Sequence, residues 1–165
     1  MNIMVPPEQV STEEFHDLLF SEQLIVWGIR FWVDGIKKGT DVHELLVEGF
    51  NKFIASGSAS ALDRMMSVIA VGAIDTIDIR CTKCKNISPD EHRILGGLAS
   101  WQCLGVGDEA DTLFEKILTP AGVRHAREPA CDLAQSFKFA GMLIRPRREV
   151  TTRPDSNALM FESIH

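Results

Sequence analysis

The sequence contains no tyrosine, and its first 29 residues contain neither lysine nor arginine. The lack of tyrosine removes one of the side chains that act as general acids or bases. No phosphate-binding loop, no Gly-x-Gly-x-x-Gly motif and no serine-centred nucleophile elbow occurs, and the five histidines are scattered along the chain. These absences favour a non-enzymatic protein, while an enzyme whose site is assembled from distant residues stays open.

Long apolar runs are also missing. The longest, residues 24–36, is interrupted by Arg30 and Asp34 and is too short to span a bilayer. Residues 1–10 include Glu8 and no basic residue, whereas a secretory signal needs a positive start. We therefore expect a cytoplasmic protein without a membrane anchor, in which the four cysteines are reduced rather than paired in disulfides.

The charge balance bears on the kind of partner. A net charge of −6 and an isoelectric point near 5.3 argue against nucleic acid, because phosphate binding requires a positive surface. Basic residues do gather between Arg124 and Arg153, but few aromatic residues accompany them. We interpret them as a solvated surface and a solubilising tail.

The sequence does contain strong helical periodicity, and 45% of its 165 residues are hydrophobic, which is enough for one core. Apolar positions three and four residues apart predict a mainly α fold: a single-domain irregular bundle of six or seven helices. We expect residues 1–10 to be a loose lead-in, residues 11–145 to form the helical domain and residues 146–165 to be a flexible tail. The predicted helices begin with a capping box at residues 11–14 and then cover residues 22–38, 42–55, 59–74, 89–104, 108–118 and 129–141, with a short helical turn that starts at residues 119–120.

One stretch shows the polar and apolar alternation of a strand instead. Residues 76–81 have this pattern, and residues 142–145 could pair with them before Pro146 ends the ladder. Two strands alone are only marginally stable, so the sequence predicts at most a minor β element on a helical body.

The predicted helix at residues 22–38 is apolar around about two thirds of its circumference, which places it at the centre of the bundle. Arg30 and Asp34 belong to its narrow polar stripe and are four residues apart. We therefore expect them to pair with each other on the exposed edge of the helix.

The most distinctive stretch is the two-cysteine loop at residues 81–91, which leads into the clearest helix start of the chain. Ser88 can cap the helix, Pro89 suits its first position, and Glu91 has the spacing of a capping box. Cys81 and Cys84 lie just before this start.

The chemistry of the two cysteines has three interpretations. In the first they bind zinc, with His92 as a third ligand and Cys131 or a water as the fourth; Lys83 and Lys85 would favour the thiolates. In the second they form a thiol-redox pair, although the Cys84 thiol precedes the helix cap by four residues and gains little from the helix dipole. In the third they are reduced structural cysteines without chemistry.

Binding to another protein is the function that the sequence favours. The predicted helix at residues 89–104 has one face of small residues that a neighbouring helix or a subunit could approach closely, and the tail ends in an apolar patch. We expect a non-enzymatic interaction or regulatory domain whose partner is another protein or a second copy, with a zinc-binding or thiol-redox protein as the alternative. The residues predicted to make this contact are Gly96, Ala99, Cys103, Leu159 and Phe161.

The run from Cys84 to Glu91, followed by Leu95 and by a later helix that ends in Leu118-Thr119-Pro120, resembles a group of small uncharacterised helical proteins of proteobacteria. In those proteins a cysteine-bearing loop similarly precedes a Ser-x-Asp-Glu helix start. The resemblance covers the second half of the chain. It implies a small helical bacterial protein and supplies no activity, cofactor or site residue.

Overall fold

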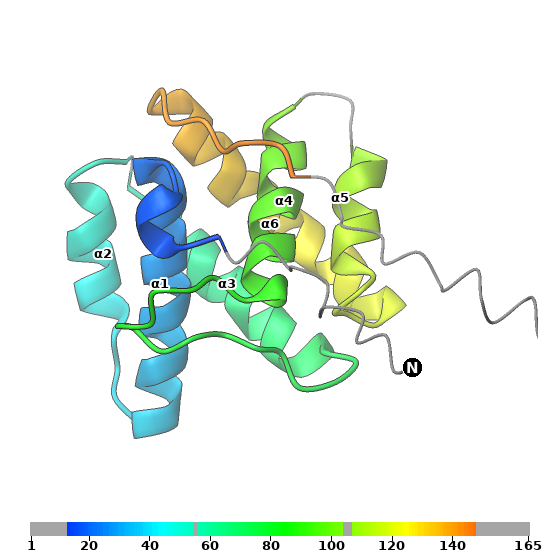
Figure 1. Ribbon diagram of the computed structural model, residues 1–165, viewed down its shortest axis with the longest axis horizontal. Coiled ribbons are helices and arrows are strands. Elements are labelled where there is room, and N and C mark those ends of the chain that lie inside the picture. Colours follow the sequence, from blue (N-terminus) through cyan, green and yellow to red (C-terminus); the bar gives the residue numbers. More distant parts are fainter. Residues whose placement is uncertain (1–12, 55, 104–106, 148–165) are drawn as a thin grey trace, which may run out of the picture.

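The computed structural model describes residues 13–54, 56–103 and 107–147, and these residues form a mainly helical bundle (Figure 1). A short 3-10 helix, η1 (Phe15–Asp17), precedes the bundle. Six α-helices follow in the described residues: α1 (Phe20–Lys38), α2 (His43–Asn51), α3 (Ser58–Gly72), α4 (Pro89–Gln102), α5 (Gly107–Phe114) and α6 (Pro120–Phe139). The mainly α fold predicted from the periodicity is confirmed.

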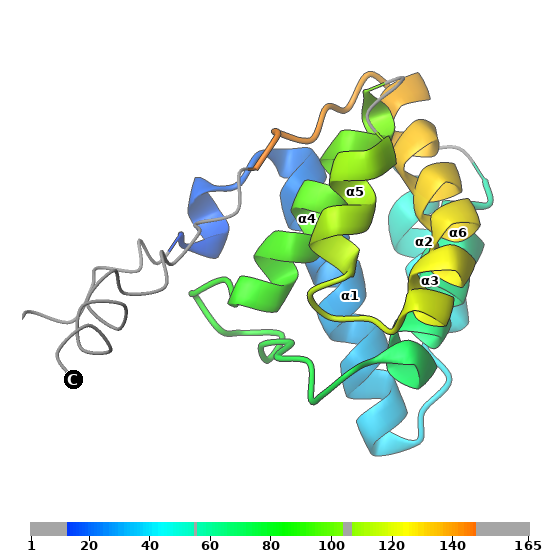
Figure 2. The same ribbon diagram turned by 90° about the vertical axis from the view of Figure 1, so that its right-hand side faces the viewer.

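The helices pack around one core. α1 and α2 lie side by side at one edge of the molecule, α5 lies at the opposite edge, and α4 lies between α1 and α5 (Figures 1 and 2). α3 and α6 make the most extensive helix pair. The rings of Phe50 and Phe137 meet edge to face at 6.2 Å and join α2 to α6 across the core. Among the described residues, no helix is long and apolar enough to cross a membrane.

The close approach of α5 to α4 depends on two adjacent glycines. A Cβ atom on Gly97 would lie 2.8 Å from the Phe114 ring, and one on Gly96 would lie 2.9 Å from Leu113. Any larger residue would therefore push α5 away from α4. The small face of α4 receives α5 of the same chain.

The predicted β pair is wrong, because the described residues contain no strand. Backbone groups of residues 76–81 bind side chains at the start of α4 instead: the N–H of Asp78 donates to Asp90 and the N–H of Arg80 donates to Glu91. Residues 142–147, which we call the C-terminal strap, bind elsewhere. The Ile144 N–H donates to the Gln102 side chain, so it cannot serve a ladder with residues 76–81.

Two helix predictions also differ from the structure. Residues 120–139 form one helix with Pro129 inside it, where the sequence predicted a break at the proline. Pro129 is buried in the bundle, and α6 continues through it although proline has no backbone N–H to donate to the preceding turn. The capping box predicted at residues 11–14 lies partly outside the described residues, and Glu13 and Glu14 are not helical.

Candidate functional site

A fully buried ion pair joins α1 to the start of α4. The Arg30 side chain is 2% exposed and that of Glu91 is 0% exposed. The Arg30 guanidinium donates from Nε to Glu91 Oε1 at 2.8 Å and from Nη2 to Oε2 at 3.0 Å. Such a two-point contact fixes the relative orientation of both side chains, and each charge depends on the other for compensation.

The predicted pair of Arg30 with Asp34 is therefore wrong. Asp34 binds Lys38 on the surface at 2.8 Å, and Arg30 turns inward. The spacing of four residues allowed the local pair, but the arginine gains more from a carboxylate and two backbone carbonyls that the fold brings to it.

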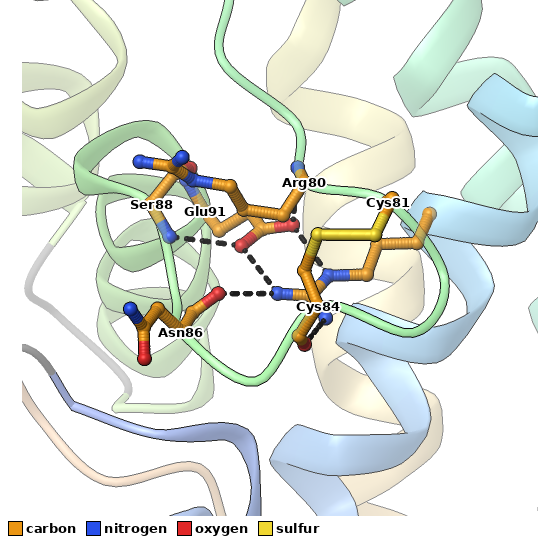
Figure 3. Close-up of a disulfide and its surroundings, with 7 residues drawn as sticks. Arg80, Cys81, Cys84, Asn86, Ser88 and Glu91 are labelled. Carbon is orange, nitrogen blue, oxygen red and sulfur yellow. Dashed lines mark hydrogen bonds and ion pairs between the residues drawn. A yellow bond between two sulfur atoms is a disulfide. The ribbon is translucent and has the colours of Figure 1, made fainter.

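The same ion pair holds both ends of the two-cysteine loop. On the C-terminal side of the disulfide, the guanidinium donates to the carbonyls of Cys84 itself at 2.7 Å and of Asn86 at 2.9 Å. Before the cysteines, the Arg80 N–H donates to Glu91 Oε1 at 3.1 Å. The loop is thus fixed at both ends by groups that do not involve sulfur (Figure 3).

The helix start predicted at Ser88 is confirmed. Ser88 Oγ accepts the Glu91 N–H at 3.0 Å, and the Ser88 N–H donates to the Glu91 carboxylate at 2.9 Å. Glu91 therefore serves the cap, the Arg80 backbone and Arg30 at once. The capping pattern in the sequence signalled the first of these roles only.

Cys81 and Cys84 form a disulfide, with their Cα atoms 5.2 Å apart (Figure 3). The expectation that the cysteines are unpaired does not hold for these two. Cys81 is exposed and Cys84 is half-buried, so Cys81 is the more accessible residue of the pair to a reactant from solvent. Lys83 and Lys85 are exposed on the same loop and add positive charge to it.

The other two residues predicted to bind metal lie on different helices. His92 is on α4 beside Glu13, with 3.8 Å between His92 Nε2 and Glu13 Oε2, and Cys131 is a free, half-buried cysteine on α6. Burial lowers the pKa of His92, and the nearby Arg147 charge lowers it further. Within residues 13–54, 56–103 and 107–147, no group of three or more His, Cys, Asp or Glu side chains could hold a metal ion. A zinc site in the reduced protein stays a prediction, and elemental analysis of that form tests it.

The residues predicted to contact a partner have different surroundings. Gly96 and Ala99 are buried under elements of the same chain, with Leu113 and Arg147 over Gly96. Cys103, at the end of α4, is exposed. Leu159 and Phe161 lie outside the described residues.

A second charged cluster, which the sequence patterns did not reveal, holds the C-terminal strap on α1. Glu22 is fully buried and accepts hydrogen bonds from the side chains of Arg145 at 2.6 Å and Arg147 at 2.9 Å. Burial alone would raise the pKa of Glu22, but these hydrogen bonds outweigh it and lower the pKa from 4.5 to about 2. The ordered contacts thus continue to Arg147, past the predicted end of the helical domain at residue 145.

Comparisons with known proteins add no relative. No family model, no curated protein and no solved structure matches the chain. The interpretation of the site therefore depends on its own geometry and chemistry.

Proposed function

We propose that this protein is a thiol–disulfide redox protein that cycles between a Cys81–Cys84 disulfide and the corresponding dithiol. The observation that carries the proposal is a disulfide in an exposed loop whose two ends are anchored by the Arg30–Glu91 ion pair. None of the anchoring hydrogen bonds involves sulfur, so we expect them to persist when the disulfide is reduced and to keep the two thiols close enough to re-form it.

A purely structural role explains this disulfide poorly. A bridge between residues three apart closes a very short loop, and the chain-entropy model gives such a loop only about 2 kcal/mol of stabilisation. The hydrogen bonds at both loop ends already restrict the same backbone. In the cytoplasm that the sequence predicts, disulfides are usually transient and catalytic or redox-sensing, which agrees with a cycling pair.

The reaction is a two-step exchange with a disulfide of a partner molecule. The Cys81 thiolate attacks one sulfur of that disulfide, a Cys81–partner bond forms, and the other partner sulfur leaves as a thiolate and takes up a proton. The Cys84 thiolate then attacks Cys81 Sγ, which re-forms the Cys81–Cys84 bond and releases the second partner thiol. Two electrons pass to the partner, and the reverse sequence oxidises a partner dithiol.

A redox titration tests this function. The protein is equilibrated in glutathione buffers from roughly −320 to −180 mV, the range that covers cytosolic and more oxidising compartments. Free thiols are then alkylated and mapped by mass spectrometry. We expect Cys81 and Cys84 to change together between dithiol and disulfide within this range, while Cys103 and Cys131 do not pair with them. If the pair kept one state across all buffers, the proposal would fail.

A second candidate function is binding to another protein, and a surface of exposed apolar side chains favours it. This terminal apolar surface consists of Leu19, Phe20, Phe53 and Leu143, which are between 42% and 63% exposed. The rings of Phe20 and Phe53 meet at 5.0 Å, and the Leu143 carbonyl accepts the Ser21 hydroxyl, so the start of α1, the turn after α2 and the C-terminal strap all contribute. Exposed apolar groups that gather in this way are typical of interaction sites.

Sedimentation equilibrium tests the form of this candidate in which the partner is a second copy. Self-association that disappears in Phe20→Ser and Phe53→Ser would support it. Val71→Ser is the control, because Val71 is 91% exposed at the end of α3 and lies outside the surface. If the protein were a monomer at every concentration, the hypothesis that it forms a homo-oligomer would be rejected.

A further inference from the structure

A small apolar pocket lies next to the two-cysteine loop, between α1 and α3. Segment 75–79 connects α3 to the loop (Figure 1), and its residues Asp75, Thr76, Ile77 and Ile79 line one side of the pocket. Its lining includes Trp32, Val33, Ile69, Ala70, Ile77 and Ile79. None of the contacts that anchor the loop uses these side chains.

The size of the pocket limits what it can hold. Its volume is about 220 Å³, below the roughly 300–1,000 Å³ of sites that enclose whole small molecules or cofactors. The lining is mainly apolar, so the pocket suits one apolar side chain of a larger molecule rather than a complete ligand.

A residue that lines the pocket lies only two positions before the disulfide, a separation that suits an extended peptide. Ile79 lines the pocket and precedes Cys81 by two residues, so their Cα atoms are at most about 7 Å apart. In an extended segment, side chains two residues apart point the same way and are separated by about the same distance. A peptide cysteine can therefore meet Cys81 while a residue two positions away enters the pocket.

We propose that the substrate of the Cys81–Cys84 pair is a cysteine-bearing segment of another protein that carries an apolar side chain two residues from its cysteine. The proposal rests on the redox function proposed above and names its substrate class. Acidic residues beside that cysteine would complement Lys83 and Lys85, which are exposed on the loop. The chemistry of the exchange is unchanged: the peptide supplies the disulfide that Cys81 attacks.

Exchange kinetics with synthetic peptides test this specificity. The reduced protein is mixed with the disulfide-linked dimer of Ac-Leu-Glu-Cys-Glu-Leu-NH2 or of Ac-Ser-Glu-Cys-Glu-Ser-NH2, which have equal charge, and with glutathione disulfide. Acid-quenched samples are resolved by chromatography and mass spectrometry. Because burial of a leucine side chain changes binding by about tenfold or more, we expect the leucine peptide to react at least about tenfold faster than the other two.

Two variants locate the effect in the pocket. Ala70→Phe fills the pocket from the exposed surface of α3. It should lower the exchange rate of the leucine peptide to that of the serine peptide. Ser67→Phe places the same ring at another exposed position of α3 and should keep the preference.

The outcomes separate the two proposals. Equal rates for the leucine and serine peptides, or glutathione disulfide as fast as the leucine peptide, would overturn the substrate class while leaving the redox function intact. A wild-type protein as unreactive as Cys81→Ser toward all three disulfides would overturn the redox function itself.

Discussion

The guanidinium of Arg30 contacts both carboxylate oxygens of Glu91, a residue 61 positions later, and neither side chain reaches solvent. This pair organises the region around the candidate site. It joins α1 to the start of α4, and its hydrogen bonds hold the backbone of the two-cysteine loop on both sides of the disulfide. The buried part of the site is thus the ion pair, and the disulfide lies in its more exposed part.

Removal of one partner of this ion pair should be strongly destabilising. Arg30→Met leaves Glu91 buried without its counter-charge, and such a loss costs about 3–5 kcal/mol. The double variant Arg30→Met, Glu91→Met removes both charges and should recover part of that loss. Urea denaturation measures the free energy of unfolding of the wild type, of Arg30→Met and of the double variant.

The matched control for this prediction is Arg64→Met. Arg64 binds Glu128 and Asp132 on the surface, and exposed pairs contribute about 0–1 kcal/mol. If Arg30→Met cost no more than Arg64→Met, the ion pair would not be the anchor of the loop.

Removal of the disulfide should have a much smaller effect than removal of the ion pair. The double variant Cys81→Ser, Cys84→Ser should lower the free energy of unfolding by no more than about 2 kcal/mol, because the bridge closes a short loop that is held at both ends. Urea denaturation of the wild type with and without a reductant measures the stabilisation by the disulfide independently. The difference in unfolding free energy should be of the same size. A loss comparable to that of Arg30→Met would mark the disulfide as a structural staple and argue against cycling.

The contrast between Ser88 and Arg30 explains how much of this site could be predicted from the sequence. The helix start is encoded locally, since Ser88, Pro89 and Glu91 lie within four positions and capping requires those residue types at that spacing. The ion pair is encoded only in the fold. Arg30 had a local carboxylate at Asp34, and nothing in the sequence marks Glu91 as a better partner. The one available signal was an arginine in a helix that is apolar around most of its circumference.

Backbone hydrogen bonds explain the wrong β prediction in the same way. Residues 76–81 alternate like a strand, but in the folded chain the side chains of Asp90 and Glu91 accept the N–H groups of Asp78 and Arg80. A strand pattern shows which side chains are apolar and does not show which groups the backbone will bind. The small face of α4 was likewise visible as a pattern, while the identity of its neighbour, α5, came only from the structure.

The Glu22 cluster predicts a specific dependence of stability on pH. Its folded pKa of about 2 lies below the ordinary value of 4.5, so the contribution of Glu22 is complete above about pH 5 and is lost as the pH falls toward 2. A shift of this size corresponds to roughly 3 kcal/mol. The difference in unfolding free energy between the wild type and Glu22→Gln should therefore shrink as the pH is lowered from 7 to 2.

Glu48→Gln is the control for this pH series. Glu48 pairs with Lys52 on the surface, where both side chains are more than 60% exposed, so its removal should change the unfolding free energy by less than about 1 kcal/mol at any pH. A constant difference between the wild type and Glu22→Gln across the series would show that the buried carboxylate is not stabilised by Arg145 and Arg147.

The contact between α4 and α5 gives the last prediction. A leucine at Gly97 would have its Cβ atom 2.8 Å from the Phe114 ring, which is itself buried and cannot move aside freely. Overpacking of this kind costs about 1–3 kcal/mol, even though leucine is a better helix former than glycine.

Ser67→Leu is the control: it places leucine at an exposed position of α3 and should be neutral or slightly stabilising. Thermal and urea unfolding of both variants measures the difference, and equal stability of Gly97→Leu and Ser67→Leu would mean that α5 does not pack on this face of α4 in solution. In that case the face would be open to a partner, as the sequence alone suggested.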